Sequence, residues 1–201
     1  MKAFSSLPSG FGEILSINLQ KNKKSAMIIN ISCVLIAAAM LVPALFLSEK
    51  PITDLLDLDG GAGAYFLRFG VFMAGLIAYM ILHELVHGIA MHICGTKKVR
   101  YGFTGLYAFA GSDDYYDKSG YIFIALAPIA VWGVVLAVMC AAVPPEWFWI
   151  VYIIEIMNVS GAAGDIYVTV RFSRLPKDIL VRDTGIEMSV YSAEGAADDK
   201  H

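Results

Sequence analysis

Charged residues are scarce in this sequence, and Lys and Arg are absent from its four longest apolar stretches. Only 16% of the 201 residues are charged, the formal net charge is −3, and 58% of the residues are hydrophobic. Without an excess of basic residues, the chain offers no surface for nucleic acid, which we do not expect as a partner. The hydrophobic fraction exceeds what a water-soluble core requires, so we expect a lipid bilayer to cover the surplus apolar surface.

Cysteine is also rare. The three cysteines, Cys33, Cys94 and Cys140, fall in or at the end of apolar stretches, where a disulfide framework of the secreted kind is not expected. The sequence predicts one membrane-embedded domain over residues 1–201, with a cytoplasmic N-terminal segment (1–25) and a polar cytoplasmic tail (175–201). Within that tail, we expect residues 195–201 to be disordered.

Four stretches reach the roughly 20 apolar residues that a membrane-spanning helix needs. They are residues 26–48, 69–94, 121–143 and 147–170. Only Pro144-Pro145-Glu146 separates the third stretch from the fourth, which predicts a tight turn between antiparallel helices. The sequence therefore predicts an all-α integral membrane fold with about four transmembrane helices.

The basic residues indicate the orientation of these helices. Thirteen of the fifteen Lys and Arg residues flank the stretches on one side, and only Lys50 and Arg68 lie on the other. Because cytoplasmic loops of membrane proteins are enriched in Lys and Arg, both termini are expected in the cytoplasm.

The segment between the second and third stretches, residues 96–120, has a different pattern. Apolar and aromatic residues recur at period two around Thr104-Gly105, namely Val99, Tyr101, Phe103, Tyr107 and Phe109. This pattern predicts a small cytoplasmic β-hairpin with one apolar face. The hairpin could pack as a lid against the membrane interface, or its edge strand could bind an extended peptide.

The second stretch contains the run His83-Glu84-Leu85-Val86-His87. Residues four apart lie on one helical face, so the two imidazoles can bind one metal ion. In this motif the histidines bind zinc, and the glutamate acts as a general base on a water molecule. A charge inside a bilayer costs about 2.5 to 3.5 kcal/mol on insertion scales, so such residues usually serve a function. The alternative is a pair of hydrogen-bonded packing histidines. His92 falls on the opposite face and is not expected to be a ligand.

A catalytic zinc site usually takes a third protein ligand. Besides Glu84, the four stretches contain two acidic residues, Glu155 and Asp165. Counted from the outer ends of their stretches, His83 and His87 lie 13 and 17 residues deep, Asp165 lies 18 deep, and Glu155 only 8. At about 1.5 Å per residue, Glu155 is displaced from the histidines by roughly 8 to 14 Å. Asp165 is therefore the predicted third ligand.

Asn158 shares a helical face with Glu155 and Asp165. Its amide could hydrogen-bond a substrate backbone or a developing oxyanion, or it could make an interhelical polar contact. Glu155 is a candidate for a proton path, with a buried protonated carboxyl as the alternative. Gly161 and Gly164 would permit the close approach of a neighbouring helix.

These motifs resemble the site-2 protease superfamily of intramembrane metalloproteases, and more closely the short bacterial membrane proteins called putative zincin peptidases. The resemblance covers residues 69–170. It rests on the His83–Gly88 run, on Ala125-Leu126-Ala127-Pro128 at the start of the next helix, and on residues 158–165. In site-2 proteases the last motif has a Pro three residues after its Asn and a Gly after its Asp. Here Gly161 stands at the Pro position, and Gly164 precedes Asp165.

The resemblance implies a Zn²⁺ enzyme of the bacterial cytoplasmic membrane that hydrolyses peptide bonds of membrane proteins or peptides, within or beside the bilayer. His83, His87 and Asp165 would be the zinc ligands and Glu84 the general base. The alternative function is a metal-binding membrane protein without hydrolytic activity, such as an inactive protease relative or a transporter subunit. A serine site at Ser160-Gly161 is a third interpretation, and it requires a base near Ser160.

Overall fold

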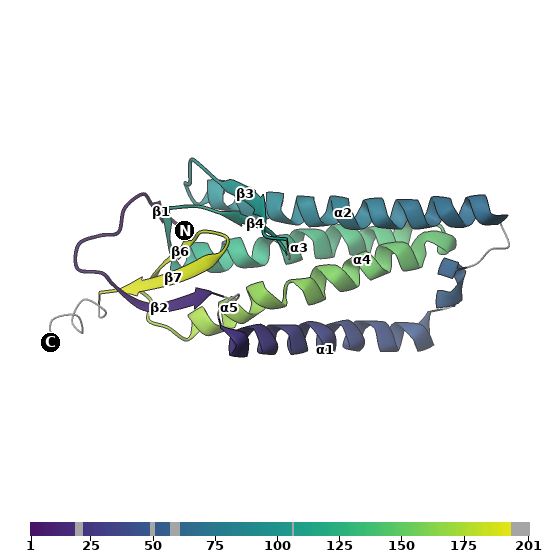
Figure 1. The fold of residues 1–201 in the computed structure, drawn as a ribbon, viewed down its shortest axis with the longest axis horizontal. Helices are drawn as coiled ribbons and strands as arrows, with labels where there is room; N and C mark the ends of the chain where they lie inside the picture. The colour runs from purple at the N-terminus through teal and green to yellow at the C-terminus, as the bar shows by residue number, and fades with distance from the viewer. Residues whose placement is uncertain (19–21, 49–50, 57–60, 106, 194–201) are drawn as a thin grey trace. The chain divides into compact units, whose positions relative to one another are not determined.

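Long helices dominate the computed structural model, which describes residues 1–18, 22–48, 51–56, 61–105 and 107–193 (Figure 1). The described residues include α1 (Lys23–Leu47), α2 (Gly61–Ile93), α3 (Lys118–Ala142), α4 (Phe148–Gly161) and α5 (Ala163–Ser173). Two short 3-10 helices, η1 (Ile52–Leu56) and η2 (Pro145–Trp147), lie in the connections. As predicted, four helical segments of the described residues are long and apolar enough to cross a membrane: α1, α2, α3 and Pro145–Ser173.

The fourth predicted helix is interrupted. α4 ends at Gly161 and α5 begins at Ala163, with Ala162 between them at φ −76° and ψ 10°. Glycine is a weak helix former, and two glycines flank this point. Among the described residues, no neighbouring atom comes within 4 Å of a Cβ placed on Gly161 or Gly164. The close helix approach expected at these glycines is therefore not found, and their effect is to let a new helix start just before Asp165.

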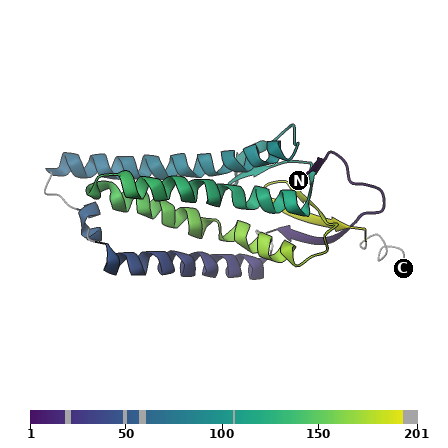
Figure 2. The same ribbon diagram turned by 180° about the vertical axis from the view of Figure 1, so that it is seen from behind.

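The prediction of an all-α fold is wrong, because the described chain also contains a five-stranded antiparallel sheet. Its strands, in spatial order, are β1 (Ala3–Phe4), β5 (Tyr115–Asp117), β6 (Leu180–Asp183), β7 (Glu187–Ser192) and β2 (Gly12–Asn18). The views in Figure 1 and Figure 2 both show β2 beside β7. Residues 1–25 and 175–201, which we expected only as flanking segments, thus supply four of the strands. The prediction failed because such short strands depend on partners far away in the sequence.

A second, two-stranded sheet is the hairpin of β3 (Arg100–Phe103) and β4 (Ala108–Gly111). At its turn, the backbone N–H of Thr104 donates to the carbonyl of Tyr107 at 3.0 Å. Gly105 has a φ of +89°, a left-handed conformation that glycine adopts without steric cost. The predicted segment 96–120 therefore contains a hairpin, but it also contains β5, which belongs to the larger sheet.

The chain divides into two compact units. The first comprises residues 1–29, 84–128 and 164–201, and the second comprises residues 30–83 and 129–163. The single domain predicted for residues 1–201 stays a prediction. Residues 195–201, predicted to be disordered, lie outside the described part of the chain.

Each unit has its own apolar core. In the first unit, Ile17, Val181 and Val190 of the sheet are fully buried against helical residues, which include Ala90 and Met91 of α2 and Val168 and Phe172 of α5. In the second, Leu136 of α3 packs with Ile150, Val151 and Ile154 of α4. The first core matters for the site, because Ala90 and Val168 lie one helical turn beyond His87 and Asp165 respectively.

Candidate metal centre

His83 and His87 lie one turn apart on α2, and both are half-buried. The boundary between the two units falls between His83 and Glu84, but α2 is continuous there, so helix geometry sets the position of His83 relative to His87. Their side chains share one face of the helix. The predicted base, Glu84, is also half-buried.

His87 is oriented by a backbone carbonyl. Its Nδ1 lies 2.9 Å from the carbonyl oxygen of Ile124 in α3. Because a carbonyl can only accept a hydrogen bond, Nδ1 carries the proton. Nε2 of the same ring lies 3.7 Å from Oδ2 of Asp165. In the neutral ring, Nε2 is then the nitrogen that carries the lone pair, and it faces the predicted third ligand, as a zinc ligand requires.

Asp165 stands in the first turn of α5. The break at Ala162 creates this helix N-terminus, and the helix dipole favours a negative charge there. The packing of Val168 and Phe172 into the core of the first unit holds α5 in place. The side chain of Asp165 remains 27% exposed, compared with 12% for His87. The carboxylate is thus fixed in position and still accessible.

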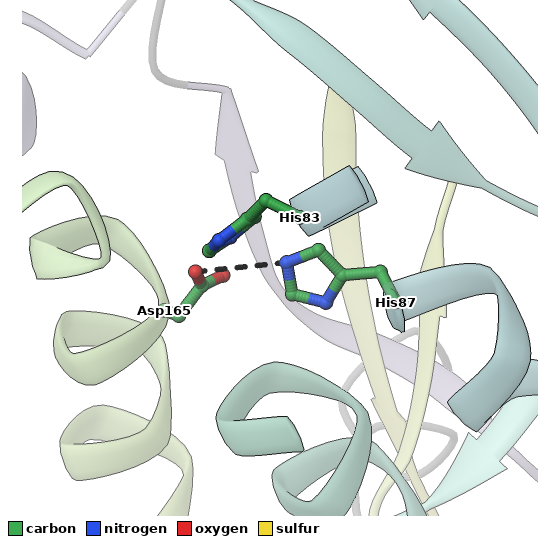
Figure 3. Close-up of side chains that lie close together, drawn as sticks. All are labelled: His83, His87 and Asp165. Carbon is green, nitrogen blue, oxygen red and sulfur yellow. Dashed lines mark ion pairs between the residues drawn. The ribbon is translucent and has the colours of Figure 1, made fainter. Parts of the chain in front are cut away.

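Together, His83, His87 and Asp165 form a cluster that fits a zinc ion (Figure 3). Each offers one ligand atom, and these atoms all lie within 4.8 Å of one another. A tetrahedral zinc with ligand bonds of about 2.1 Å holds its ligand atoms about 3.4 Å apart. The 3.7 Å between His87 and Asp165 is close to that spacing. Two imidazoles and one carboxylate are also a donor set of catalytic zinc sites, which keep a fourth position for water.

The orientation of His83 depends on a residue that sequence reasoning missed. Nδ1 of His83 lies 2.9 Å from the hydroxyl of Tyr79, one turn earlier in α2. The Tyr79 hydroxyl in turn donates to Oδ1 of Asn158 at 3.1 Å. The spacing of four residues between Tyr79 and His83 could have indicated this contact, but only the fold brings Asn158 to Tyr79.

Asn158 and Glu155 lie together in α4. Asn158 is fully buried, and its Nδ2 donates to Oε2 of Glu155 at 3.2 Å and to the carbonyl of Ile129 at 3.4 Å. The substrate or oxyanion contact of Asn158 and the proton path through Glu155 stay predictions. Asn158 accepts a hydrogen bond from the Tyr79 hydroxyl, and Glu155 is connected to that hydroxyl through Asn158.

The hairpin of β3 and β4 contacts α2 beside the base. A Cβ on Gly88 would collide with the ring and hydroxyl of Tyr101, so the glycine allows Tyr101 to lie directly on the helix. Burial raises the pKa of the Tyr101 phenol, and the charge of Glu84 raises this pKa further. Tyr101 thus stays protonated near Glu84.

His92 lies outside the cluster. It belongs to the end of α2, and its Nδ1 lies 2.6 Å from the carbonyl oxygen of Thr96. Because that carbonyl follows the last turn of α2, His92 satisfies the backbone where the helix ends.

Comparisons relate this chain to known proteins. Over 118 residues, the chain is 29% identical to an "Uncharacterized 24.7 kDa protein in gap 5'region" from Pyrococcus woesei, a match that covers 56% of this chain and 51% of that protein. The chain thus spans about half the length of this curated relative. No solved structure matches the chain. The model of the putative zincin peptidase family matches residues 76–180, a range that contains His83, Glu84, His87 and Asp165. The chain therefore belongs to the putative zincin peptidase family.

Proposed function

We propose that this protein is a zinc-dependent endopeptidase of the membrane, which cleaves peptide bonds within or beside the bilayer. The observation that carries this proposal is the convergence of His83, His87 and Asp165, with ligand atoms within 4.8 Å of one another, next to Glu84. Membership of the putative zincin peptidase family supports it.

In this proposal, His83, His87 and Asp165 would bind the zinc ion, and Glu84 would act as the general base and then as the general acid. When bound there, zinc would lower the pKa of a water molecule and polarise the scissile carbonyl of the substrate. Glu84 takes the proton of the attacking water and returns it to the leaving amine. Asp165 lies in the first turn of α5, where the helix dipole favours a negatively charged ligand.

The sheet supports a topology with both termini in the cytoplasm. Strands β1 and β2 come from the N-terminal segment, β5 comes from the segment between α2 and α3, and β6 and β7 follow α5. Since one sheet cannot be divided by a bilayer, these three segments lie on the same side of the membrane. Thirteen of the fifteen Lys and Arg residues belong to or adjoin them, which favours the cytoplasmic side. The substrate class is a membrane protein or a membrane-bound peptide.

The test is the conservative variant Glu84→Gln in detergent-purified protein. We expect it to bind as much zinc as the wild type and to cleave roughly 100- to 10,000-fold more slowly, since it lacks the general base. Cleavage is measured with a library of transmembrane peptides and a library of soluble quenched fluorescent peptides. The exposed Glu146, outside the site, gives the matched control Glu146→Gln, which should cleave like the wild type.

Metal removal gives a second arm of this test. Treatment with a chelator should abolish cleavage, and added zinc should restore it. Cleavage by Glu84→Gln at the wild-type rate would contradict the proposal. Zinc binding by a wild-type protein that cleaves none of the peptides would favour the non-hydrolytic alternative, a metal-binding relative or transporter subunit.

A further inference from the structure

We infer that Tyr79 and Asn158 are positioning residues that set the tautomer of His83, so that its Nε2 is the nitrogen available to the metal; the inference rests on the proposed zinc function. The residues form a chain of hydrogen bonds from Ile129 and Glu155 through Asn158 and Tyr79 to His83. All of them belong to the second unit.

The direction of each hydrogen bond follows from chemistry, starting at Asn158. Its amide lies 3.4 Å from the carbonyl oxygen of Ile129, which can only accept, so Nδ2 must face this carbonyl. Nδ2 also donates to Oε2 of Glu155 at 3.2 Å. A flipped amide would point its oxygen at these two oxygens. The Oδ1 atom of Asn158 therefore faces Tyr79.

The two hydrogen bonds of the Tyr79 hydroxyl determine which nitrogen of His83 carries the proton. Oδ1 of Asn158 can only accept, so the single proton of the Tyr79 hydroxyl points to it across 3.1 Å. The phenolic oxygen can then only accept from Nδ1 of His83, at 2.9 Å. His83 is consequently protonated on Nδ1, and its Nε2 carries the lone pair that a metal needs.

Burial makes this arrangement persistent. Asn158 is fully buried, so water does not compete for its amide. A Cβ on Gly133 of α3 would lie 3.6 Å from Nδ2 of Asn158 and 3.7 Å from Oε1 of Glu155, so α3 covers the pair at normal contact distance. The rings of Tyr79 and His83 also meet edge to face, with centroids 5.6 Å apart.

The two histidines thus acquire the same tautomer by different means. Nδ1 of His87 donates to the backbone carbonyl of Ile124, which no substitution removes. The proton on Nδ1 of His83 is held through the side chains of Tyr79 and Asn158, which substitution can remove. Partners of this kind typically contribute 10- to 100-fold to metal affinity.

The experiment compares Tyr79→Phe, Asn158→Leu and the double variant with the wild type. Tyr152→Phe is the matched control, because this tyrosine of α4 donates its hydroxyl to the carbonyl of Met40 instead of to the site. The first measurement is ¹⁵N NMR of histidine-labelled, metal-free protein, with the His83 signals assigned through His83→Gln. The second is the zinc dissociation constant, from competition with a chromophoric chelator.

In the wild type and Tyr152→Phe, we expect a single His83 tautomer protonated on Nδ1. Tyr79→Phe should show a mixture of tautomers and bind zinc about 10- to 100-fold more weakly. Asn158→Leu should also bind zinc more weakly, because the Tyr79 hydroxyl, without Asn158 as its acceptor, can donate to Nδ1 and shift the proton to Nε2. Because Asn158 acts through Tyr79, the double variant should be no weaker than Tyr79→Phe.

A wild-type tautomer and zinc affinity in Tyr79→Phe would overturn the inference, and this variant tests it even if Asn158→Leu does not fold. The inference would also be overturned if the losses of zinc affinity in the two single variants multiplied in the double variant. An Asn158→Leu protein with normal zinc affinity and a raised KM would instead assign Asn158 to substrate binding. If the wild type bound no zinc, the proposed function would fail, while the NMR measurement would still decide the tautomer.

Discussion

The Nε2 atom of His87 lies 3.7 Å from the Oδ2 atom of Asp165, although the two residues belong to helices far apart in the sequence. Both helices continue directly into the core of the first unit, through Ala90 and Met91 in α2 and through Val168 and Phe172 in α5. The sheet completes that core with Ile17, Val181 and Val190. The distance between the two ligands is thus maintained by the packing of the sheet on the helix ends.

Replacement of Asp165 by Ala should release the metal. Two histidines alone would remain as ligands, and structural zinc sites gain about 3 kcal/mol per ligand, so affinity should fall roughly 100-fold. The measurement is zinc content by elemental analysis of detergent-purified protein. Glu146→Gln, at an exposed position outside the site, is the control and should retain zinc. Full zinc content in Asp165→Ala would remove Asp165 from the ligand set.

Substitutions of the histidines of α2 should differ in their effect on zinc content, measured by the same elemental analysis. His87→Gln should lose zinc, because it replaces a ligand. His92→Gln should retain zinc, because His92 bonds the carbonyl of Thr96 at the end of the helix and lies outside the cluster. Equal zinc loss in the two variants would mean that the histidines act through the stability of α2, not as ligands.

Gly88→Ala should destabilise the protein through Tyr101. A methyl group at this position collides with the hydroxyl and ring of Tyr101, so this exposed side chain must leave the face of the helix, which should cost about 1 kcal/mol. In a Tyr101→Ala background, the same Gly88→Ala change should be neutral or stabilising by up to about 1 kcal/mol, because alanine is the better helix former. Thermal unfolding in detergent measures both effects. The same destabilisation in both backgrounds would show that the contact with Tyr101 is not the cause.

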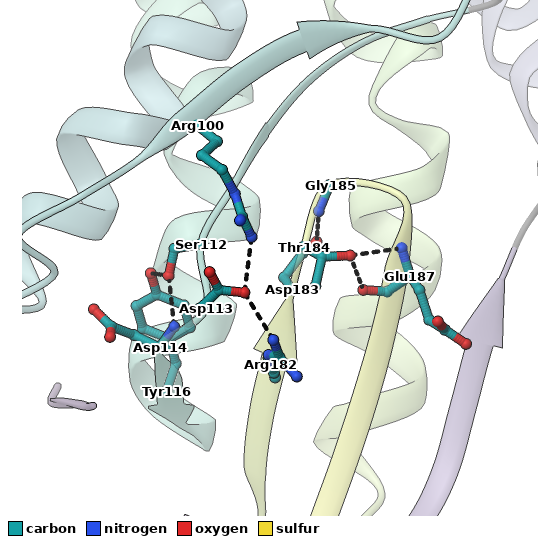
Figure 4. Close-up of polar contacts among 10 residues, drawn as sticks. All are labelled: Arg100, Ser112, Asp113, Asp114, Tyr116, Arg182, Asp183, Thr184, Gly185 and Glu187. Atoms are coloured by element: carbon teal, nitrogen blue, oxygen red, sulfur yellow. Dashed lines mark hydrogen bonds and ion pairs between the residues drawn. The ribbon is translucent and has the colours of Figure 1, made fainter. Parts of the chain in front are cut away.

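Asp113→Asn should lower stability in a pH-dependent way. Oδ1 of Asp113 accepts from Arg100 of β3 at 2.8 Å and from Arg182 of β6 at 2.7 Å, as Figure 4 shows. The hydrogen bonds from Arg182 and Arg100 lower the pKa of Asp113 below its usual value of 3.8. A lowered pKa means that the folded state binds the proton less tightly than the unfolded state. The stabilisation is therefore present above pH 3.8 and is lost as the pH falls through the folded-state pKa.

The variant should accordingly melt about 1 to 3 °C below the wild type at pH 7, a small difference because the Asp113 side chain is 59% exposed. The difference should vanish at pH values below the folded-state pKa of Asp113 and shrink in 1 M salt, which screens exposed charges. A gap in melting temperature that is independent of pH would contradict the assignment to this ion pair.

Part of the fold was predictable because it depends on local sequence. A run of about 20 apolar residues identifies a spanning helix without reference to the rest of the chain, and the part of the chain that the structure describes contains four such helical segments. The hairpin turn around Gly105 was also predictable, because alternating apolar residues flank a glycine. The strands of the larger sheet were missed. β2 and β7 do alternate, with Leu15 and Ile17 in one and Met188 and Val190 in the other, but each alternation is short and depends on its distant partner.

The sequence by itself determined which residue types could form the site. The spacing of His83 and His87 places them on one face of any helix, because helical periodicity is a local property. Tertiary structure alone decided that Asp165 meets His87 and that Tyr79 meets Asn158. These features arise where segments distant in the chain pack together, and the identity of a packing partner is not encoded in the periodicity of either segment.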